Sequence, residues 1–386
     1  MRVGCLVMLL LSLNAVAECP VWPTVIAHRG ASGHYPEHSE IAYWQAMQQG
    51  ADFIEADLVP TKDGVLVSRH ENELSQSTNV ALLPQFAARQ TTKVVDGIAV
   101  RGWFSEDFTL AELRQLKLRE SKPQVRVSNT RFNDQFGILT LAEVMQLVLR
   151  FEQQTGRKVG LYLETKHPTY FRADGRYLNG QPIDTDTSVL LLQQLGQWQQ
   201  QHQHPIYIQS FEISNLWWMR QQGLQQYQVS AQLVQLIGDI SGSALFPQSN
   251  FAEPWDVLSH VAPKLPFPAE YRTLLEKTGF HYGDLFSSAG LAFLSQYANG
   301  IGPWKDQWYQ KEQPLLSAAQ LKAARLLVHP YTFRAEKEFL PATIATLNAE
   351  LKLRYQQGVD GVFTDFTEIA VQVRNETCLD KSMTSN

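Results

Sequence analysis

Side chains that can move protons, bind cations and hold anions are concentrated in one early stretch of the chain. His28 and Arg29 directly follow an apolar run, and Glu55 and Asp57 lie two residues apart within a second one. Alternate residues of a β-strand share a face, so this spacing predicts that both carboxylates point the same way. His70 ends a third apolar run. The stretch therefore predicts part of a site that combines histidines with a carboxylate pair.

Glu164 and Lys166 repeat the two-residue spacing in a later apolar run, "LYLETK". A single carboxylate in a strand is more often part of an ion pair. Three carboxylates on neighbouring strands, however, would repel one another when buried unless a cation neutralised them. A ligand set made only of oxygen atoms suits Ca²⁺ or Mg²⁺ better than Zn²⁺. We therefore expect Glu55, Asp57 and Glu164 to bind a divalent metal ion.

The two histidines and two cations complete this interpretation. Histidine is the side chain that moves protons near neutral pH without a large pKa shift, so we expect His28 and His70 to act as acid and base. Taken singly, each would be interpreted as a structural histidine at a turn, but their position beside Arg29 and the carboxylates favours a functional role. Arg29 and Lys166 beside a divalent metal suit the binding of a phosphate. Each could instead pair with the nearby carboxylates.

Other polar residues also end apolar runs, namely Gln209 in "IYIQSF", His329 in "LLVHPYTF" and Asp365 in "GVFTDF". We expect His329 to line the substrate pocket. His38, in "PEHS", is the best candidate for a histidine that supports a site residue.

These residues need a fold that brings them together. Short β-branched runs alternate with longer amphipathic segments, which is typical of parallel strands joined by helices. The predicted strands span residues 24–28, 53–58, 160–166, 205–211, 229–236, 300–303, 326–331 and 361–365. The predicted helices span residues 40–50, 140–156, 186–201, 212–223, 268–279, 317–326 and 345–358. Eight such units close most economically into a (β/α)8 TIM barrel, in which the active site is built at the carboxyl ends of the strands.

Two segments interrupt the alternation. Residues 73–136 are long and polar with one short helical pattern, "TLAELRQLKL", which predicts a small insertion after the second strand. Residues 238–266 are predicted to form a long loop. The Asp-Gly pair in "TKDGVLV", residues 61–67, predicts a hairpin that returns His70 to the mouth containing His28.

The first residues predict export. An arginine precedes a short apolar run that ends in Ala15, Val16 and Ala17, which is typical of a cleavable signal peptide over residues 1–17. Glu18 before Cys19 argues against a lipoprotein signal. We expect a single exported domain over residues 18–386, periplasmic and without a stable membrane anchor.

Net charge and composition indicate which classes of binding partner to expect. The formal net charge is −5, and no Lys/Arg-rich run occurs, so nucleic acid is not an expected partner. In an oxidising compartment Cys19 and Cys378 could form a disulfide that joins the two ends of the mature chain, or both could remain free thiols. The oligomeric state is not predicted.

The motifs resemble those of the glycerophosphodiester phosphodiesterase family, most closely its periplasmic branch. The matching segments are "HRGASGHYPEHS", "GADFIEADLVPTKDGVLVSRH", "FTLAELRQLKL", "LYLETKHP", "YIQSF", "LVQLI", "YANGIGP", "LVHPYTFR" and "GVFTDF". The resemblance implies a TIM barrel with an insertion after its second strand. It implies that His28 and His70 are the acid–base pair, that Glu55, Asp57 and Glu164 bind Ca²⁺, with Mg²⁺ as the lesser candidate, and that Arg29 and Lys166 contact phosphate.

Three residues depart from the family pattern. Glu71 follows the second histidine where aspartate is common, and Thr165 and His167 stand where apolar or small residues are more frequent. None of these changes removes a catalytic group. Each is expected to alter specificity or the hydrogen bonding of a neighbour.

The expected reaction cleaves a small glycerophosphodiester to glycerol 3-phosphate and an alcohol, through a cyclic phosphate formed by the neighbouring glycerol hydroxyl. One alternative is a phospholipase D-like hydrolase of intact lipids, entered across an apolar surface made by Trp217, Trp218, Trp304 and Trp308. The other is a binding protein on the same scaffold that does not catalyse the reaction.

Overall fold

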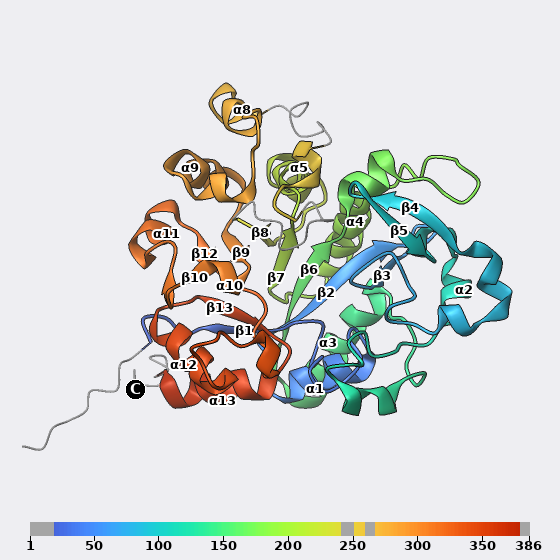
Figure 1. The fold of residues 1–386 in the computed structure, drawn as a ribbon, viewed down its shortest axis with the longest axis horizontal. Coiled ribbons are helices and arrows are strands. Elements are labelled where there is room, and N and C mark those ends of the chain that lie inside the picture. Colours follow the sequence, from blue (N-terminus) through green and yellow to red (C-terminus); the bar gives the residue numbers. More distant parts are fainter. Residues whose placement is uncertain (1–18, 241–250, 259–266, 379–386) are drawn as a thin grey trace, which may run out of the picture.

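The computed structural model describes residues 19–240, 251–258 and 267–378. The predicted signal peptide lies outside the described residues, as does most of the predicted loop at 238–266, of which 251–258 include a short helix. In the described part, eight parallel strands form a nearly closed barrel surrounded by helices (Figure 1). The predicted (β/α)8 barrel is therefore confirmed.

All eight predicted barrel strands are present, in the predicted order along the chain. They are β1 (Thr24–Ala27), β2 (Phe53–Pro60), β6 (Gly160–Thr165), β7 (Ile206–Ser210), β8 (Gln232–Ile237), β9 (Gly300–Pro303), β12 (Leu327–Val328) and β13 (Gly361–Thr364). Around the barrel the order is β12, β9, β8, β7, β6, β2, β1 and β13. Most strand residues are buried, because helices cover the outside and side chains fill the inside.

The barrel closes between β12 and β13 through isolated hydrogen bonds. The strand predicted at 326–331 is shorter than expected, and Pro330 within it has no N–H to donate. The Asp360 N–H nevertheless donates to the Val328 carbonyl at 3.2 Å, and the Phe363 N–H donates to the Pro330 carbonyl at 3.1 Å. These two hydrogen bonds connect β12 to β13 and so close the barrel.

Helices lie at the seven predicted positions. They are α1 (Glu40–Gln48), α3 (Leu141–Thr155), α4 (Thr187–Gln199), α5 (Ile213–Trp218), α8 (Ala269–Leu275), α11 (Ala318–Ala324) and α12 (Leu347–Gln356). Helix α3 begins at a capping box of Thr140 and Glu143 and ends at Gly156, whose φ of +74° suits glycine. No described helix has the length and apolarity needed to cross a bilayer.

Several helices were not predicted from the sequence pattern. They are α6 (Leu224–Gln226), α7 (Trp255–Leu258), α9 (Ser288–Tyr297), α10 (Lys305–Trp308) and α13 (Thr367–Thr377), whereas α2 (Leu110–Leu113) lies within the helical pattern predicted at residues 109–118. Helix α13 is the most consequential of them, because it follows β13 directly and packs on α12 and β1. It places the end of the described chain beside its beginning (Figure 1).

The segment at 73–136 packs on the β2–β3 hairpin. Strand β3 (Leu66–Ser68) pairs antiparallel with β2, as the Asp-Gly turn predicted. Beyond it lies a second hairpin of β4 (Thr91–Val95) and β5 (Ile98–Gly102), which was not predicted. A separate apolar cluster joins this segment to the barrel; it includes Val59, Val67, Leu74, Phe104 and Leu118. The limits of the insertion, residues 73–136, stay a prediction.

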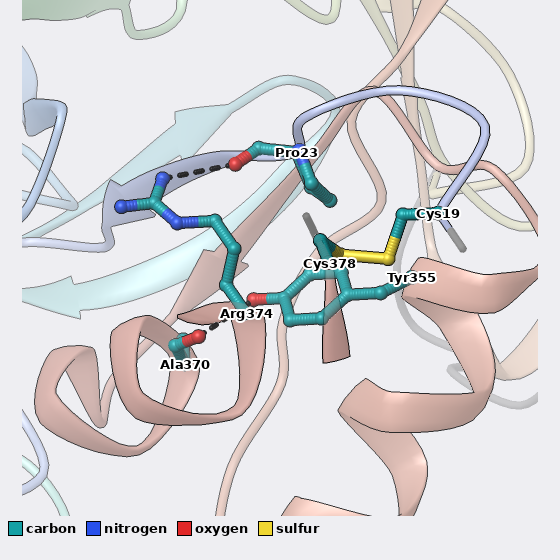
Figure 2. Close-up of a disulfide and its surroundings, with 6 residues drawn as sticks. All are labelled: Cys19, Pro23, Tyr355, Ala370, Arg374 and Cys378. Carbon is teal, nitrogen blue, oxygen red and sulfur yellow. Dashed lines mark hydrogen bonds between the residues drawn. A yellow bond between two sulfur atoms is a disulfide. The ribbon is translucent and has the colours of Figure 1, made fainter. Parts of the chain in front are cut away.

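A disulfide links Cys19 to Cys378 across 359 residues, with a Cα–Cα distance of 4.9 Å (Figure 2). Both sulfur atoms are buried between the chain ends. Beside the bridge, Arg374 on α13 donates to the Pro23 carbonyl at 2.9 Å, so a hydrogen bond ties the same two segments (Figure 2). The sequence left open whether Cys19 and Cys378 form a disulfide or stay free thiols, and the structure contains the disulfide.

Removing this bridge should lower stability, because a crosslink between distant residues restricts the unfolded chain. We expect Cys19→Ser, Cys378→Ser and the double variant each to lose about 2–5 kcal/mol of unfolding free energy. The measurement is equilibrium denaturation of the three variants and the wild type, with and without reductant. The single and double variants should be equally stable. Equal stability of the wild type and the double variant would contradict the expected stabilisation.

Candidate active site

A cavity of about 880 Å³ opens at the carboxyl ends of the barrel strands. Of the seven predicted site residues, six line it, namely His28, Arg29, Glu55, His70, Glu164 and Lys166. The seventh, Asp57, lies directly behind them and contacts both cations. The barrel therefore brings together residues from β1, β2, β6 and the β2–β3 hairpin. Their individual roles stay predictions.

The three predicted metal ligands form one compact, buried cluster. A carboxylate oxygen from each of Glu55, Asp57 and Glu164 lies within 4.8 Å of the others. The parallel register explains this geometry, since Asp57 on β2 is the direct partner of Glu164 on β6. Gln209 on β7 donates its side-chain N–H to Glu55 at 3.3 Å and to Glu164 at 3.4 Å, while the carboxylate oxygens remain the candidate ligands. This donor set could bind a hard divalent cation.

The predicted phosphate-binding cations also pair with the cluster. Lys166 Nζ lies 2.7 Å from Glu164 and 3.5 Å from Asp57, and Arg29 Nε lies 3.2 Å from Asp57. The Arg29 backbone N–H donates to Glu55 at 2.8 Å, which is possible because Arg29 has a φ of +59°. The ion pairing considered as an alternative is thus present, and both side chains still face the cavity.

Crowding of the carboxylates shifts their protonation. Burial, with the charges of Asp57 and Glu164, raises the pKa of Glu55 well above its usual value. Burial also raises the pKa of Glu164 to about 8, although Lys166 opposes this. Lys166 and Arg29 overcome the burial of Asp57 and hold its pKa well below the usual range. Burial and mutual repulsion therefore oppose full ionisation of the three carboxylates, and a bound cation would relieve that repulsion.

His38 supports the cluster from behind. Its Nε2 lies 3.0 Å from Asp57 Oδ2, and its Nδ1 lies 2.7 Å from the Tyr43 hydroxyl and 3.0 Å from the Ser68 hydroxyl. Because a carboxylate only accepts, Nε2 carries the hydrogen in this contact. His38 thus contacts Asp57, one of the predicted metal ligands, as expected for a supporting residue.

His28 is fixed by a carboxylate whose role the sequence did not reveal. Asp365, which follows β13, accepts a hydrogen bond from His28 Nδ1 at 2.6 Å. Arg126 and Arg334 both pair with the same carboxylate, and together with His28 they outweigh its burial and hold the pKa of Asp365 well below its usual range. His28 Nε2 is left as the free ring nitrogen. The contact spans 337 residues, so no local pattern could have indicated it.

His70 has its own carboxylate partner. Its Nδ1 lies 2.9 Å from Glu71 Oε1, while a third of the side chain stays exposed in the cavity. Burial within the site and the charges of Arg29 and Lys166 lower the pKa of His70 to about 4. Burial and Arg29 likewise lower the pKa of His28 to about 3. Both pKa shifts favour the neutral imidazole, and each ring has its Nδ1 beside a carboxylate.

His329 does not line this cavity, so that expectation is wrong. The side chain is buried inside the barrel, where its Nδ1 lies 3.0 Å from the Tyr162 hydroxyl. The error concerns depth along the barrel, because His329 lies in an interior layer with Tyr162 and Tyr207, while Tyr331, two residues closer to the carboxyl end, reaches the cavity.

The four tryptophans of the lipid-entry alternative do not form one surface. Trp217 and Trp308 are buried in the core, and Trp218 packs against it. Only Trp304 lines the cavity, where it meets Phe251 edge to face. The cavity lining contains three further cations, Lys122, Lys305 and Arg334, which were not predicted from the sequence.

Comparisons with known proteins agree with this geometry. The fold and the cavity define a TIM barrel with a candidate active site at the carboxyl ends of its strands. Residues 28–263 match the model of the glycerophosphoryl diester phosphodiesterase family. A glycerophosphodiester phosphodiesterase of Arabidopsis thaliana is 32% identical over 363 residues, covering 89% of this chain and 84% of the relative. The chain belongs to the glycerophosphoryl diester phosphodiesterase family and is an enzyme of that kind.

A second relative agrees with this assignment, and two solved structures share the fold. A glycerophosphodiester phosphodiesterase of Haemophilus influenzae is 29% identical over 366 residues, covering 90% of this chain and 88% of the relative. The fold matches a phosphodiesterase of Oleispira antarctica, solved with its product sn-glycerol-3-phosphate, at a TM-score of 0.51 and 19% identity, over 92% of this chain and 97% of that one. A protein of Silicibacter pomeroyi matches at a TM-score of 0.54 and 16% identity, over 93% and 95% of the two chains.

Proposed function

We propose that the protein releases glycerol 3-phosphate and an alcohol from small glycerophosphodiesters, with Ca²⁺ bound by Glu55, Asp57 and Glu164. The observation that carries the proposal is the convergence of a buried oxygen cluster and two carboxylate-held histidines on one cavity. The bound cation would stabilise negative charge on the phosphoryl oxygens. Arg29 and Lys166, at the edge of the same cluster, would hold the phosphate.

His28 and His70 supply the proton transfers in this proposal. Each has Nδ1 held by a carboxylate, so Nε2 is available to accept or donate a proton. Both rings are neutral before substrate binds, and the negative charge of a bound phosphodiester raises the pKa of a neighbouring imidazole. One histidine can then remain neutral as the base while the other becomes the protonated acid.

The reaction is proposed to proceed in two displacements at phosphorus. The glycerol hydroxyl next to the phosphate attacks phosphorus, and its proton passes to the base histidine. The bond from phosphorus to the alcohol oxygen breaks, and the acid histidine protonates that oxygen. Water then opens the cyclic phosphate while the histidines exchange roles. Holding the hydroxyl and phosphorus together makes the first step intramolecular.

The test is a glycerol 3-phosphate release assay on head groups such as choline, ethanolamine and glycerol. We expect chelator to abolish release and Ca²⁺ to restore it more fully than Mg²⁺. A substrate that lacks the neighbouring hydroxyl should not be cleaved, and phosphorus NMR should detect the cyclic phosphate with the natural one. Full turnover of the hydroxyl-free substrate would exclude cyclisation. Binding without turnover in the presence of Ca²⁺ would favour the binding-protein alternative.

We also propose that the enzyme is exported to the periplasm, as expected from the signal-like residues 1–17. The Cys19–Cys378 bridge supports this, because disulfides persist in oxidising compartments. Mass spectrometry of the protein recovered from a periplasmic extract should give a chain that begins after Ala17. Recovery of the uncleaved chain from the cytosol alone would exclude export.

A further inference from the structure

The three residues that depart from the family pattern include two that contact each other. Glu71 Oε2 lies 3.1 Å from His167 Nε2, while the other oxygen of Glu71 binds His70. On its far side, His167 Nδ1 lies 2.6 Å from Asp96 Oδ2. A continuous series of contacts therefore runs from His70 to Asp96: an ion pair joins His70 to Glu71, and hydrogen bonds join Glu71 to His167 and His167 to Asp96.

The protonation of this series follows from its geometry. Both ring nitrogens of His167 face carboxylates, and carboxylates only accept, so both nitrogens must carry hydrogen. Burial disfavours the charged ring, but Asp96 and Glu71 outweigh it and raise the pKa of His167 well above its usual value. The doubly protonated ring holds one oxygen of Glu71 and directs the other to His70 Nδ1.

Asp96 is presented by the tip of the β4–β5 hairpin in the segment predicted as an insertion. Val95 pairs with Ile98, so Asp96 and Gly97 form a two-residue turn with φ of +47° and +81°. The hairpin is anchored by Lys93, whose Nζ lies 2.9 Å from Glu106 and 2.6 Å from Asp107. The hairpin thus holds a carboxylate at a fixed place beside the cavity.

His167 itself is held in an unusual backbone conformation. Its φ is +47°, in the left-handed region that non-glycine residues rarely occupy, and Pro168 follows it. Such conformations persist where surrounding contacts fix them. The two carboxylates that bracket the ring are such contacts.

We propose that Asp96, His167 and Glu71 are positioning residues that fix the ring orientation and tautomer of His70, and that this is the task of the inserted hairpin. Glu71 contacts His70 directly, while His167 and Asp96 act through it. A histidine that is held at Nδ1 offers Nε2 to the substrate in one orientation, and the tautomer is set by the bond at the other nitrogen. This inference rests on the proposed acid–base role of His70.

The principal variants are His167→Asn and Asp96→Asn. Asparagine tolerates the left-handed backbone, so His167→Asn should keep the local fold while it removes both ring contacts. Arg101→Ala is the matched control, because this exposed side chain on β5 donates only to Gln90 and lies outside this series of contacts. Thermal unfolding of each variant, followed by circular dichroism, confirms that the assays compare folded proteins.

We expect His167→Asn and Asp96→Asn each to lower kcat by about tenfold, with KM changed by less than about twofold. The double variant should lose no more than His167→Asn alone, because residues that act as one unit are not additive. In nitrogen NMR of histidine-labelled protein, the His70 signals, assigned by their loss in His70→Ala, should shift from the Nδ1–H tautomer toward a mixture. Arg101→Ala should leave kcat and these signals unchanged.

Retention of kcat within about twofold in folded His167→Asn would overturn the inference. So would a loss of kcat without a change in the His70 tautomer, since a structural defect could produce it. His70→Ala separates the two levels of the proposal. If that variant stays active, the acid–base role fails and the positioning role with it; if it is inactive while His167→Asn is fully active, only the positioning role fails.

Discussion

His28→Ala and His70→Ala are each expected to lower kcat by about 10²–10⁴-fold on glycerophosphocholine, which is the usual contribution of a positioned acid or base. Neither change should unfold the protein. Asp365 keeps its pairs with Arg126 and Arg334 when His28 is removed, and Glu71 keeps His167 when His70 is removed. Steady-state kinetics under saturating metal measures the loss.

The same two variants can assign the acid and the base. A substrate with a 4-nitrophenol leaving group departs without protonation, so the variant that lacks the acid should recover most of its loss on this substrate. The variant that lacks the base should stay slow on both substrates. Glu376→Gln, an exposed change on α13 outside the cavity, serves as the control. Wild-type rates in either histidine variant would contradict the two-histidine mechanism.

The second large effect concerns Glu55→Gln, which should abolish activity and yet stabilise the metal-free protein. The pKa of Glu55 is raised in the folded state, so its ionisation opposes folding. The metal-free wild type should therefore lose stability as pH rises from the ordinary glutamate pKa toward the raised one. Glutamine cannot ionise, so the variant should be the more stable protein at about pH 8, with the difference vanishing near about pH 4.

Metal should reverse this order. Ca²⁺ at about 100 times its dissociation constant should add about 2.7 kcal/mol to the wild type, because it binds only the folded state. Glu55→Gln, which lacks one of the three clustered carboxylates, should gain little. The measurement is thermal unfolding across pH in chelator and in Ca²⁺, again with Glu376→Gln as control. A variant less stable than the wild type in chelator at about pH 8 would contradict the proposed repulsion among the carboxylates.

Local patterns predicted the features of this molecule that depend on neighbouring residues. Strand periodicity placed Glu55 and Asp57 on one face, and the barrel rule placed both beside Glu164 at the carboxyl ends of β2 and β6. The Asp-Gly turn before β3 correctly predicted the hairpin that carries His70 to the cavity. Each of these predictions used the two-residue period of a strand or a turn motif, and both patterns involve only a few consecutive residues.

What the sequence did not reveal depends on distant contacts. Asp365 reaches His28 across 337 residues, and Arg126 reaches the same carboxylate across 239. Neither helical nor strand periodicity relates residues so far apart in the chain. The β4–β5 hairpin is different, because "VVDGIAV" contains an Asp-Gly turn between apolar residues and could have been recognised by the rule that found β3. Without it, Asp96 could not be placed beside His167.

The bridge between Cys19 and Cys378 gives the protein the connectivity of a ring. Strands β1 and β13 are adjacent in the barrel, and the bridge joins the segment before β1 to the end of α13, which follows β13. A protease that cuts once anywhere between the two cysteines therefore yields two fragments that remain one covalent molecule. Such a nicked enzyme would migrate as a single species without reductant and separate only when the disulfide is reduced. On a denaturing gel, the full-length band of a chain that has been cut once therefore disappears only after the disulfide has also been reduced.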